Sequence, residues 1–311
     1  MRQFLIALWA IPLLGANMQV NVVKNPVHVV LIDFATDNSA WSSPINSAFK
    51  YYLDRTQENI SFTELTWTNR TDNGVFLERI KSLKPDVVFL PDHAFYRMFA
   101  KDLAKLDIHI STFFLSLPRH EVLDYANQSG VFNEYPSDKI VEFARQSFKV
   151  EKIAILGGPY ANDVIQKITA PLQGLEAKVE IDSFIEGTWL DYKERLLAIE
   201  KEYDAVWLLM PFGVKDGDNT VDFKKLEPVA RQLKIPSFGF GGTQGVPRTI
   251  TIGLVQEKIG QYCATLVYSA VFKRENKGIK DYTSYELLID TEHALKLGLK
   301  ITDEMANFLR G

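Results

Sequence analysis

Short apolar runs alternate along the chain with segments in which apolar residues recur every three or four positions. The run 27–34 is almost continuously apolar and rich in β-branched residues, which is typical of a strand buried on both faces of a parallel sheet. After a polar stretch, Ser43 and Pro44 give a helix start, and the spacing of Ile45, Phe49 and Leu53 gives that helix one apolar face. The same strand–helix unit recurs to about residue 240.

This alternation predicts an α/β fold with parallel sheets. About four strands precede residue 120 and about four follow residue 150, which predicts two Rossmann-like lobes. The segment between them, around Asn127, Gly130 and Pro136, is expected to be a loop. Further strands are predicted at 61–67, 86–90, 108–115, 152–156, 178–185, 204–210, 236–240 and 286–289, and further helices at 75–83, 93–106, 137–148, 160–175, 222–233 and 256–273, with others opening at Thr188 and containing Ala294 and Leu297.

The residues after 249 hold only two strand–helix pairs, too few for a third domain. They must be shared between the lobes, so a multi-strand hinge is expected. The predicted division places 24–133 and 250–278 in lobe one, and 134–249 and 279–311 in lobe two.

Composition removes several classes of function. The 311 residues carry a formal net charge of −4, whereas a protein that coats nucleic acid needs clustered positive charge. The single cysteine excludes an internal disulfide, a thiolate zinc site and an iron–sulfur cluster, and Cys263 is expected to be a buried thiol on an apolar helix face. Five scattered histidines do not suggest a metal cage. No metal and no cofactor are therefore expected.

The N-terminus has the parts of a secretory signal. Arg2 precedes an uncharged apolar run, 4–16, that is too short to span a membrane and ends in the small residues Gly15 and Ala16. Residues 1–16 are expected to be a cleaved signal peptide, with an uncleaved N-terminal anchor as the alternative. Because no cysteine follows the run, the exported protein is not expected to be a lipoprotein.

The C-terminal part carries a family resemblance. The stretch TITIGLVQEKIGQYCATLVYSAV, with Gly260 near the start of a helix, and the stretch YELLIDTEHALKLGLKITDEM, with Ile289–Asp290, resemble the substrate-binding proteins of ABC transporters that have the type I periplasmic binding protein fold, including the tryptophan-binding-like components. The resemblance covers most of residues 27–305. It departs after the fourth strand, where LPRHEVLDYANQSGVFNEYPSD replaces the family's usual pattern, so it does not carry ligand identity.

In parallel sheets, ligands bind beyond the carboxyl ends of the strands. The loops at those positions name the candidate ligand-binding residues: Asp33, Trp41, Asp92, His93, Thr112, Ser116, Gly158, Tyr160, Pro211, Phe212, Gly242 and Gln244.

For several of these candidates the residue type indicates a contact, and Thr112 and Ser116 could add hydroxyl donors. Asp33 and Asp92 could hold a ligand ammonium, with helix capping or solvation as the alternative. The GGPY turn offers backbone N–H groups to a carboxylate. The aromatic residues line a cleft or pack on the protein, and packing is favoured for Phe95 and Phe240.

Other motifs are weaker. The run FGFGGTQG misses the spacing of a dinucleotide fingerprint and leads into a strand instead of a helix. The segment 216–222 lacks the last acidic ligand of a calcium loop, so it is interpreted as a solvated loop. No nucleophile elbow, P-loop or HExxH motif is present, so no catalytic residue is assigned.

The resemblance implies a monomeric periplasmic binding protein that captures a small amphipathic solute, such as an amino acid, by hinge closure and delivers it to an ABC transporter permease. A sensor of the same fold that reports to a membrane receptor is one alternative. An enzyme with its site between two α/β lobes is another, and it would require a reactive group of side chains.

The N-terminal pattern gives the first prediction. Protein recovered after export should lack residues 1–16, because the apolar run ends in small residues that suit signal cleavage. Intact-mass measurement of periplasmic material checks this, and a mass that retains the apolar run would contradict cleavage.

Overall fold

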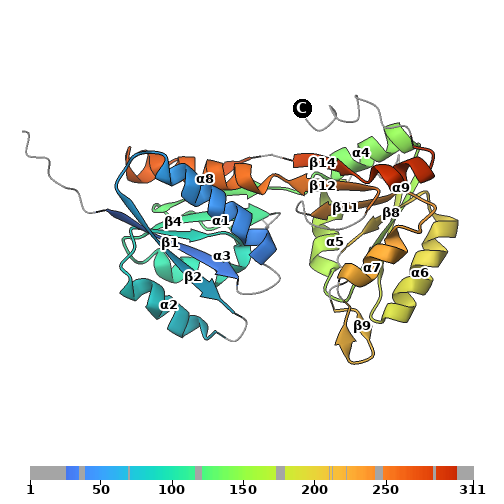
Figure 1. Ribbon diagram of the computed structural model, residues 1–311, viewed down its shortest axis with the longest axis horizontal. Coiled ribbons are helices and arrows are strands. Elements are labelled where there is room, and N and C mark those ends of the chain that lie inside the picture. Colours follow the sequence, from blue (N-terminus) through green and yellow to red (C-terminus); the bar gives the residue numbers. More distant parts are fainter. Residues whose placement is uncertain are drawn as a thin grey trace, which may run out of the picture.

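The computed structural model describes residues 26–34, 39–68, 71–115, 121–172, 179–209, 211, 213–221, 223–241, 248–282 and 285–299. These residues form two α/β lobes, each with a six-stranded sheet between two layers of helices (Figure 1). The predicted two-lobe architecture with parallel sheets is confirmed.

Lobe one is built on a sheet whose neighbouring strands all run parallel, in the order β13-β5-β4-β3-β1-β2. Its helices α1 and α8 cover one face and α2 and α3 the other, each over its own apolar cluster. The elements are β1 (Val27–Phe34), α1 (Ser39–Asp54), β2 (Ile60–Trp67), α2 (Asn73–Ser82), β3 (Val87–Leu90), α3 (His93–Leu103), β4 (His109–Leu115), β5 (Gln128–Asn133), α8 (Gln256–Val271) and β13 (Ile279–Asp281).

Lobe two has the sheet order β14-β12-β11-β8-β6-β7, in which β14 alone runs antiparallel to its neighbour. Two further apolar clusters lie on its two faces. The elements are α4 (Ser137–Phe148), β6 (Lys152–Gly157), α5 (Asn162–Thr169), the 3-10 turn Ala170–Leu172, β7 (Glu180–Ile185), α6 (Trp189–Glu202), β8 (Ala205–Leu208), the hairpin β9 (Lys215–Asp216) and β10 (Asn219–Thr220), α7 (Phe223–Ala230), β11 (Ser237–Gly241), β12 (Ile250–Leu254), β14 (Tyr285–Ile289) and α9 (Thr291–Lys296).

The chain crosses between the lobes three times: from β5 to α4, from β12 to α8, and from β13 to β14. Two predicted boundaries are therefore wrong. Residues 250–254 belong to lobe two, because β12 pairs with β11 and β14, and residues 279–281 belong to lobe one, because β13 pairs with β5. The apolar pattern of a strand indicates that it is buried, but it does not indicate which sheet it joins.

Two local predictions also differ from the structure. The expected loop between the lobes contains β5, all of whose residues are buried although Gln128, Ser129 and Asn133 are polar. Gly130 is needed there, because a Cβ atom would lie 2.4 Å from the carbonyl oxygen of Thr112 on the neighbouring strand. Helix α1 begins at Ser39, four residues before the predicted start, so Trp41 lies inside the helix.

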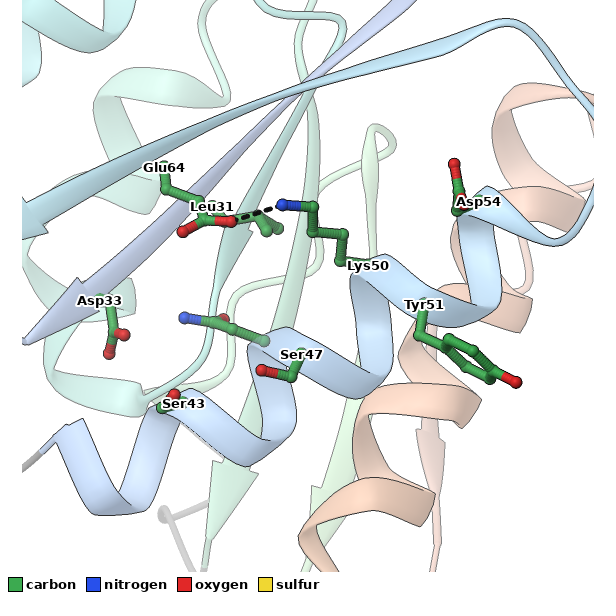
Figure 2. A pocket seen from close by; sticks show the side chains of 9 residues that line it. Leu31, Asp33, Ser43, Ser47, Lys50, Tyr51, Asp54 and Glu64 are labelled. Carbon is green, nitrogen blue, oxygen red and sulfur yellow. Dashed lines mark hydrogen bonds and ion pairs between the residues drawn. The ribbon is translucent and has the colours of Figure 1, made fainter.

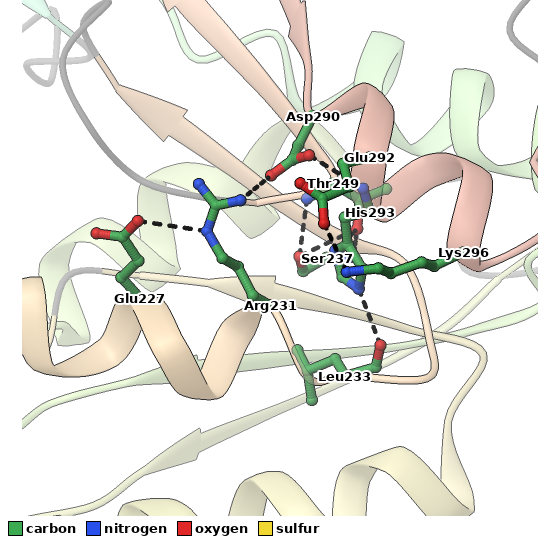
Figure 3. Close-up of polar contacts among 9 residues, drawn as sticks. All are labelled: Glu227, Arg231, Leu233, Ser237, Thr249, Asp290, Glu292, His293 and Lys296. Carbon is green, nitrogen blue, oxygen red and sulfur yellow. Dashed lines mark hydrogen bonds and ion pairs between the residues drawn. The ribbon is translucent and has the colours of Figure 1, made fainter.

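A buried polar network attaches α9 to lobe two (Figure 3). The ring of His293 lies 2.9 Å from the Leu233 carbonyl oxygen through Nε2 and 3.1 Å from the Thr249 hydroxyl through Nδ1. Because a carbonyl only accepts, Nε2 carries a proton, and in the neutral ring Nδ1 then accepts from Thr249. The Thr249 hydroxyl also accepts from the Ser237 backbone N–H at 2.9 Å, and Asp290 caps α9 by accepting from the N–H of His293. The last described helix is thereby joined to the amino ends of β11 and β12.

Helix α8 returns from lobe two to pack directly on α1. At Gly260 the two backbones approach so closely that a Cβ atom would lie 2.3 Å from the Ile45 carbonyl oxygen and 2.9 Å from Ala48 Cβ. Only glycine fits this position, because neither obstacle is the movable end of a long side chain.

Gly260→Ala should therefore lower the free energy of unfolding by about 1–3 kcal/mol, the range for an overpacked core, despite the higher helix propensity of alanine. Gly187→Ala is the matched control, because a Cβ atom there has no neighbour within 4 Å, and its effect should stay below about 0.5 kcal/mol. Urea unfolding followed by circular dichroism compares the two. Equal stability of both variants would show that α1 and α8 are further apart at Gly260 than the structure places them.

Candidate ligand-binding site

The carboxyl ends of the two sheets face each other. β5 ends at Asn133 and the chain passes within four residues into α4 of lobe two, whereas β12 ends at Leu254 and passes within two residues into α8 of lobe one. Because neighbouring parallel strands point the same way, the carboxyl end of each sheet lies toward the other lobe (Figure 1). The loops that follow these strands are therefore where a ligand could contact both lobes.

On the lobe-one side, hydrogen bonds hold the Asp33 carboxylate in place. It lies at the end of β1, and its Oδ1 accepts hydrogen bonds from the N–H of Phe34 at 2.8 Å and from the hydroxyl of Ser42, a fully buried residue in α1. Asn46, one turn further along α1, donates from Nδ2 to the Ile32 carbonyl oxygen at 3.0 Å. The first turns of α1 thus fix the carboxylate at the mouth of the lobe.

Asp92 and His93 lie at the start of α3. Asp92 is the N-cap of this helix and accepts from the N–H of Ala94 at 2.6 Å, so it takes the helix-capping role that was the alternative to ligand binding. Burial is the main cause that lowers the pKa of His93, and the positive charges of Lys167 and Arg97 lower it further, while Asp92 raises it. Lys167 belongs to α5 of lobe two, so the two lobes approach each other here.

On the lobe-two side, Tyr160 follows β6 and is 76% exposed. Its ring lies against Gly213, where a Cβ atom would be 2.8 Å from the ring and where φ is +83°. Pro211 lies in the loop after β8, as Gly213 does. It is buried, and its carbonyl oxygen accepts from the N–H of Val214. Gly158 is also buried, and its carbonyl oxygen accepts from the N–H of Ala161. The loops after β6 and β8 therefore meet at the carboxyl end of lobe two, with an aromatic ring on their surface.

The hinge adds polar groups that the site prediction did not include. Tyr135 follows β5, and burial together with the charge of Asp92 raises the pKa of its hydroxyl to about 12. The Tyr285 hydroxyl, on β14, contacts the Asn133 side chain and the Glu134 carbonyl oxygen, so two of the three crossings are hydrogen-bonded to each other.

Several predicted residues take other places. Thr112 lies three residues before the end of β4 and is fully buried, so its role as a ligand contact stays a prediction. Phe95 belongs to the core of lobe one, stacked on Phe34 at 4.2 Å between ring centroids, as its pattern favoured. Ser116, Phe212, Gly242 and Gln244 lie outside the described residues, as do the side chains of Trp41 and Phe240.

Sequence reasoning missed Ser42, Asn46 and Lys167. A signal existed for Asn46, because it directly follows Ile45 and precedes Phe49 by three positions, on the apolar side of the helix. A polar residue among apolar positions of one helix face is expected to have a specific partner. Lys167 gives no such signal, since its effect on the pKa of His93 arises only because the two lobes face each other.

The comparisons with known proteins identify the fold. No family model and no curated protein sequence matches the chain. Among solved structures, the ABC domain from Streptococcus pneumonia in complex with L-Trp has a TM-score of 0.66 at 14% identity, with 92% of this chain and 99% of that one aligned. The ligand-free, open substrate-binding protein with adhesive properties from Clostridium difficile has a TM-score of 0.69 at 14% identity, with 90% and 97% aligned. The periplasmic ribose ABC transporter from Conexibacter woesei has a TM-score of 0.63 at 12% identity, with 91% and 98% aligned.

These likenesses establish that the chain has the two-lobe fold of type I periplasmic binding proteins. Within the described ranges, no helix has both the length and the apolar character that crossing a membrane requires.

The charges at α3 and α5 give a prediction about how the lobes approach. Lys167→Met should raise the pKa of His93, because a positive charge on lobe two is removed from the surroundings of the ring. Lys105→Met, which removes a lysine paired with Asp102 elsewhere on lobe one, is the matched control and should leave that pKa unchanged. NMR titration of the histidine ring measures both. An unchanged His93 pKa in Lys167→Met would mean that the lobes do not approach here in solution.

Proposed function

We propose that this chain is the periplasmic solute-binding component of an ABC importer, and that it captures a small amphipathic organic solute, such as an amino acid, by closing its two lobes. The arrangement of the strands carries this proposal: two parallel sheets present their carboxyl ends to each other and are joined by three crossings. A solute that contacts both lobes favours the closed state in proportion to its higher affinity for that state.

The groups at the mouth suit such a solute. Lobe one contributes the Asp33 carboxylate, and lobe two contributes the exposed Tyr160 ring. An exposed aromatic ring on one lobe and a carboxylate on the other match a solute that has an apolar body and a charged end. Two of the solved structures that share this fold are a complex with L-Trp and a substrate-binding protein, which supports binding over chemistry.

An enzyme of the same fold would need a reactive group of side chains at this mouth. Three histidines in the described part of the chain lie within hydrogen-bond distance of a hydroxyl side chain: His28 of Thr63, His109 of Ser129 and His293 of Thr249. All three pairs lie near the amino ends of their strands, the opposite edge of each sheet from the mouth. They therefore do not face a substrate held between the lobes. The proposed partner is a membrane permease, with the protein acting as a monomer and without nucleic acid.

The test begins with the ligand that the protein carries. Native mass spectrometry of protein purified without unfolding should show a co-purified small molecule. Small-angle X-ray scattering should then show a smaller radius of gyration when that molecule is returned to dialysed protein, because closure brings the lobes together.

Glycerol at equal concentration is the control for non-specific solute effects. A solute that binds without reducing the radius of gyration would contradict hinge closure, and a solute that is chemically converted during incubation would favour the enzyme.

A further inference from the structure

Helices α1 and α8 lie side by side on one face of the lobe-one sheet and both run away from lobe two (Figure 1). Helix α1 follows β1, and α8 leads into β13. Because all strands of this sheet are parallel, both helices end at its amino edge, the end of lobe one that is farthest from the mouth. The surface formed there by segments 51–55 and 268–277 is named the distal patch.

The end of α1 carries exposed aromatic rings beside a cation. The rings of Tyr51 and Tyr52 meet edge to face with 5.4 Å between their centroids, and the guanidinium of Arg55 lies 5.4 Å from the Tyr51 centroid. Lys50 reaches the carboxylate of Glu64 on β2 at 2.7 Å, whereas Tyr51 points away from that pair (Figure 2). The free cation at this helix end is therefore Arg55, and it lies over a ring.

The end of α8 repeats this combination. The partly exposed rings of Tyr268 and Phe272 are stacked with 5.5 Å between their centroids, and Lys273 Nζ lies 5.1 Å from the Tyr268 centroid. Two neighbouring helices thus end in a pair of rings with a cation over one of them. The distal patch is aromatic and basic at both of its helix ends.

The turn after α8 adds positive charge. Lys273, Arg274 and Lys277 are exposed, and Glu275 is the one carboxylate within 273–277. Among the described residues, none of the three cations is paired with a carboxylate. The chain as a whole has a net charge of −4, so this turn differs in sign from the average surface.

Hydrogen bonds hold this turn in one shape. The N–H of Glu275 donates to the Ser269 carbonyl oxygen at 2.8 Å, which closes the chain back on α8. Asn276 Nδ2 donates to the Ala126 carbonyl oxygen at 2.6 Å, and Asn276 Oδ1 accepts from the N–H of Gly278 at 3.0 Å. The cations are therefore presented from a fixed backbone instead of a loose loop.

The chain before β1 brings the same edge toward a membrane. Val27 begins β1 at the amino edge, four strand spacings or about 19 Å from β13. The apolar run 4–16 ends ten residues before Val27, a stretch that spans at most roughly 35 Å. While that run is attached and in the membrane during export, the distal patch is held close to the lipid surface.

We infer that the distal patch binds the surface of an anionic phospholipid membrane. Lysine and arginine are attracted to anionic headgroups, and tyrosine rings are favoured at the membrane–water interface. Asp54 and Glu58, which lie beside the end of α1, oppose the attraction and keep the contact reversible. The contact lies at the opposite end of lobe one from the mouth, so it leaves the mouth open to a solute. The inference goes beyond the proposed function and does not depend on which solute is bound.

The experiment is sedimentation of protein recovered after export with two kinds of vesicle. Vesicles of phosphatidylglycerol and phosphatidylcholine in equal amounts should carry the protein down, whereas vesicles of phosphatidylcholine alone should not. Binding should be lost in about 0.5 M sodium chloride, because salt screens interactions between exposed charges. This comparison needs no variant, so it holds even where a variant fails to fold.

The double variant Lys273→Gln/Lys277→Gln should weaken binding to the anionic vesicles at least tenfold, because each cation near such a surface contributes roughly fivefold. Lys149→Gln/Lys201→Gln is the matched control, because it removes the same charge from exposed positions of lobe two, and it should weaken binding less than threefold. Glu58→Gln should tighten binding, because it removes a repelling charge. Circular dichroism confirms that the variants are folded.

Four outcomes would overturn the inference. They are the absence of binding to the anionic vesicles, equal binding to neutral vesicles, equal loss of binding in the two double variants, and tighter binding to a single-stranded oligothymidylate than to the vesicles, which would indicate a nucleic acid as the partner. The proposed function is tested separately, because lobe closure around a co-purified solute is measured without vesicles.

Discussion

The close contact between α1 and α8 is the constraint on which the two-lobe arrangement depends. Helix α8 follows β12, a central strand of lobe two, yet it lies in lobe one because Gly260 lets its backbone meet that of α1. Once α8 is placed there, β13 is brought to the edge of the lobe-one sheet, and the chain must cross again to form β14. Three crossings instead of one follow from this single helix contact, and they set the two carboxyl edges facing each other.

The alternation of apolar runs predicted most strands because a strand covered on both faces must be apolar throughout. β5 shows where that logic fails. It is central and fully buried, yet Gln128, Ser129 and Asn133 are polar and are accommodated by particular partners, such as the His109 ring at 2.7 Å from the Ser129 hydroxyl and the Tyr96 hydroxyl at 3.1 Å from Gln128. Those partners come from distant elements, so a local pattern could not reveal them.

The site could be predicted only in outline. The rule that ligands bind beyond the carboxyl ends of parallel strands placed Asp33 and Tyr160 correctly on the facing edges. It did not separate Asp33 from Asp92, since whether a carboxylate caps a helix depends on backbone geometry. It also included Thr112, although the predicted strand 108–115 ends at Leu115 as β4 does, so that Thr112 lies three residues inside the strand.

The return of α8 and β13 has a consequence for the order in which the protein folds. The core of lobe one combines residues before 133 with residues after 256, so a chain synthesised only as far as β12 has the material for most of lobe two and an incomplete lobe one. Contacts between residues so far apart in sequence slow folding, because a long loop must close first. The proposed export requires the chain to cross a membrane before it folds. Because lobe one cannot be completed until the last part of the chain is available, the polypeptide stays in a translocation-competent state for longer.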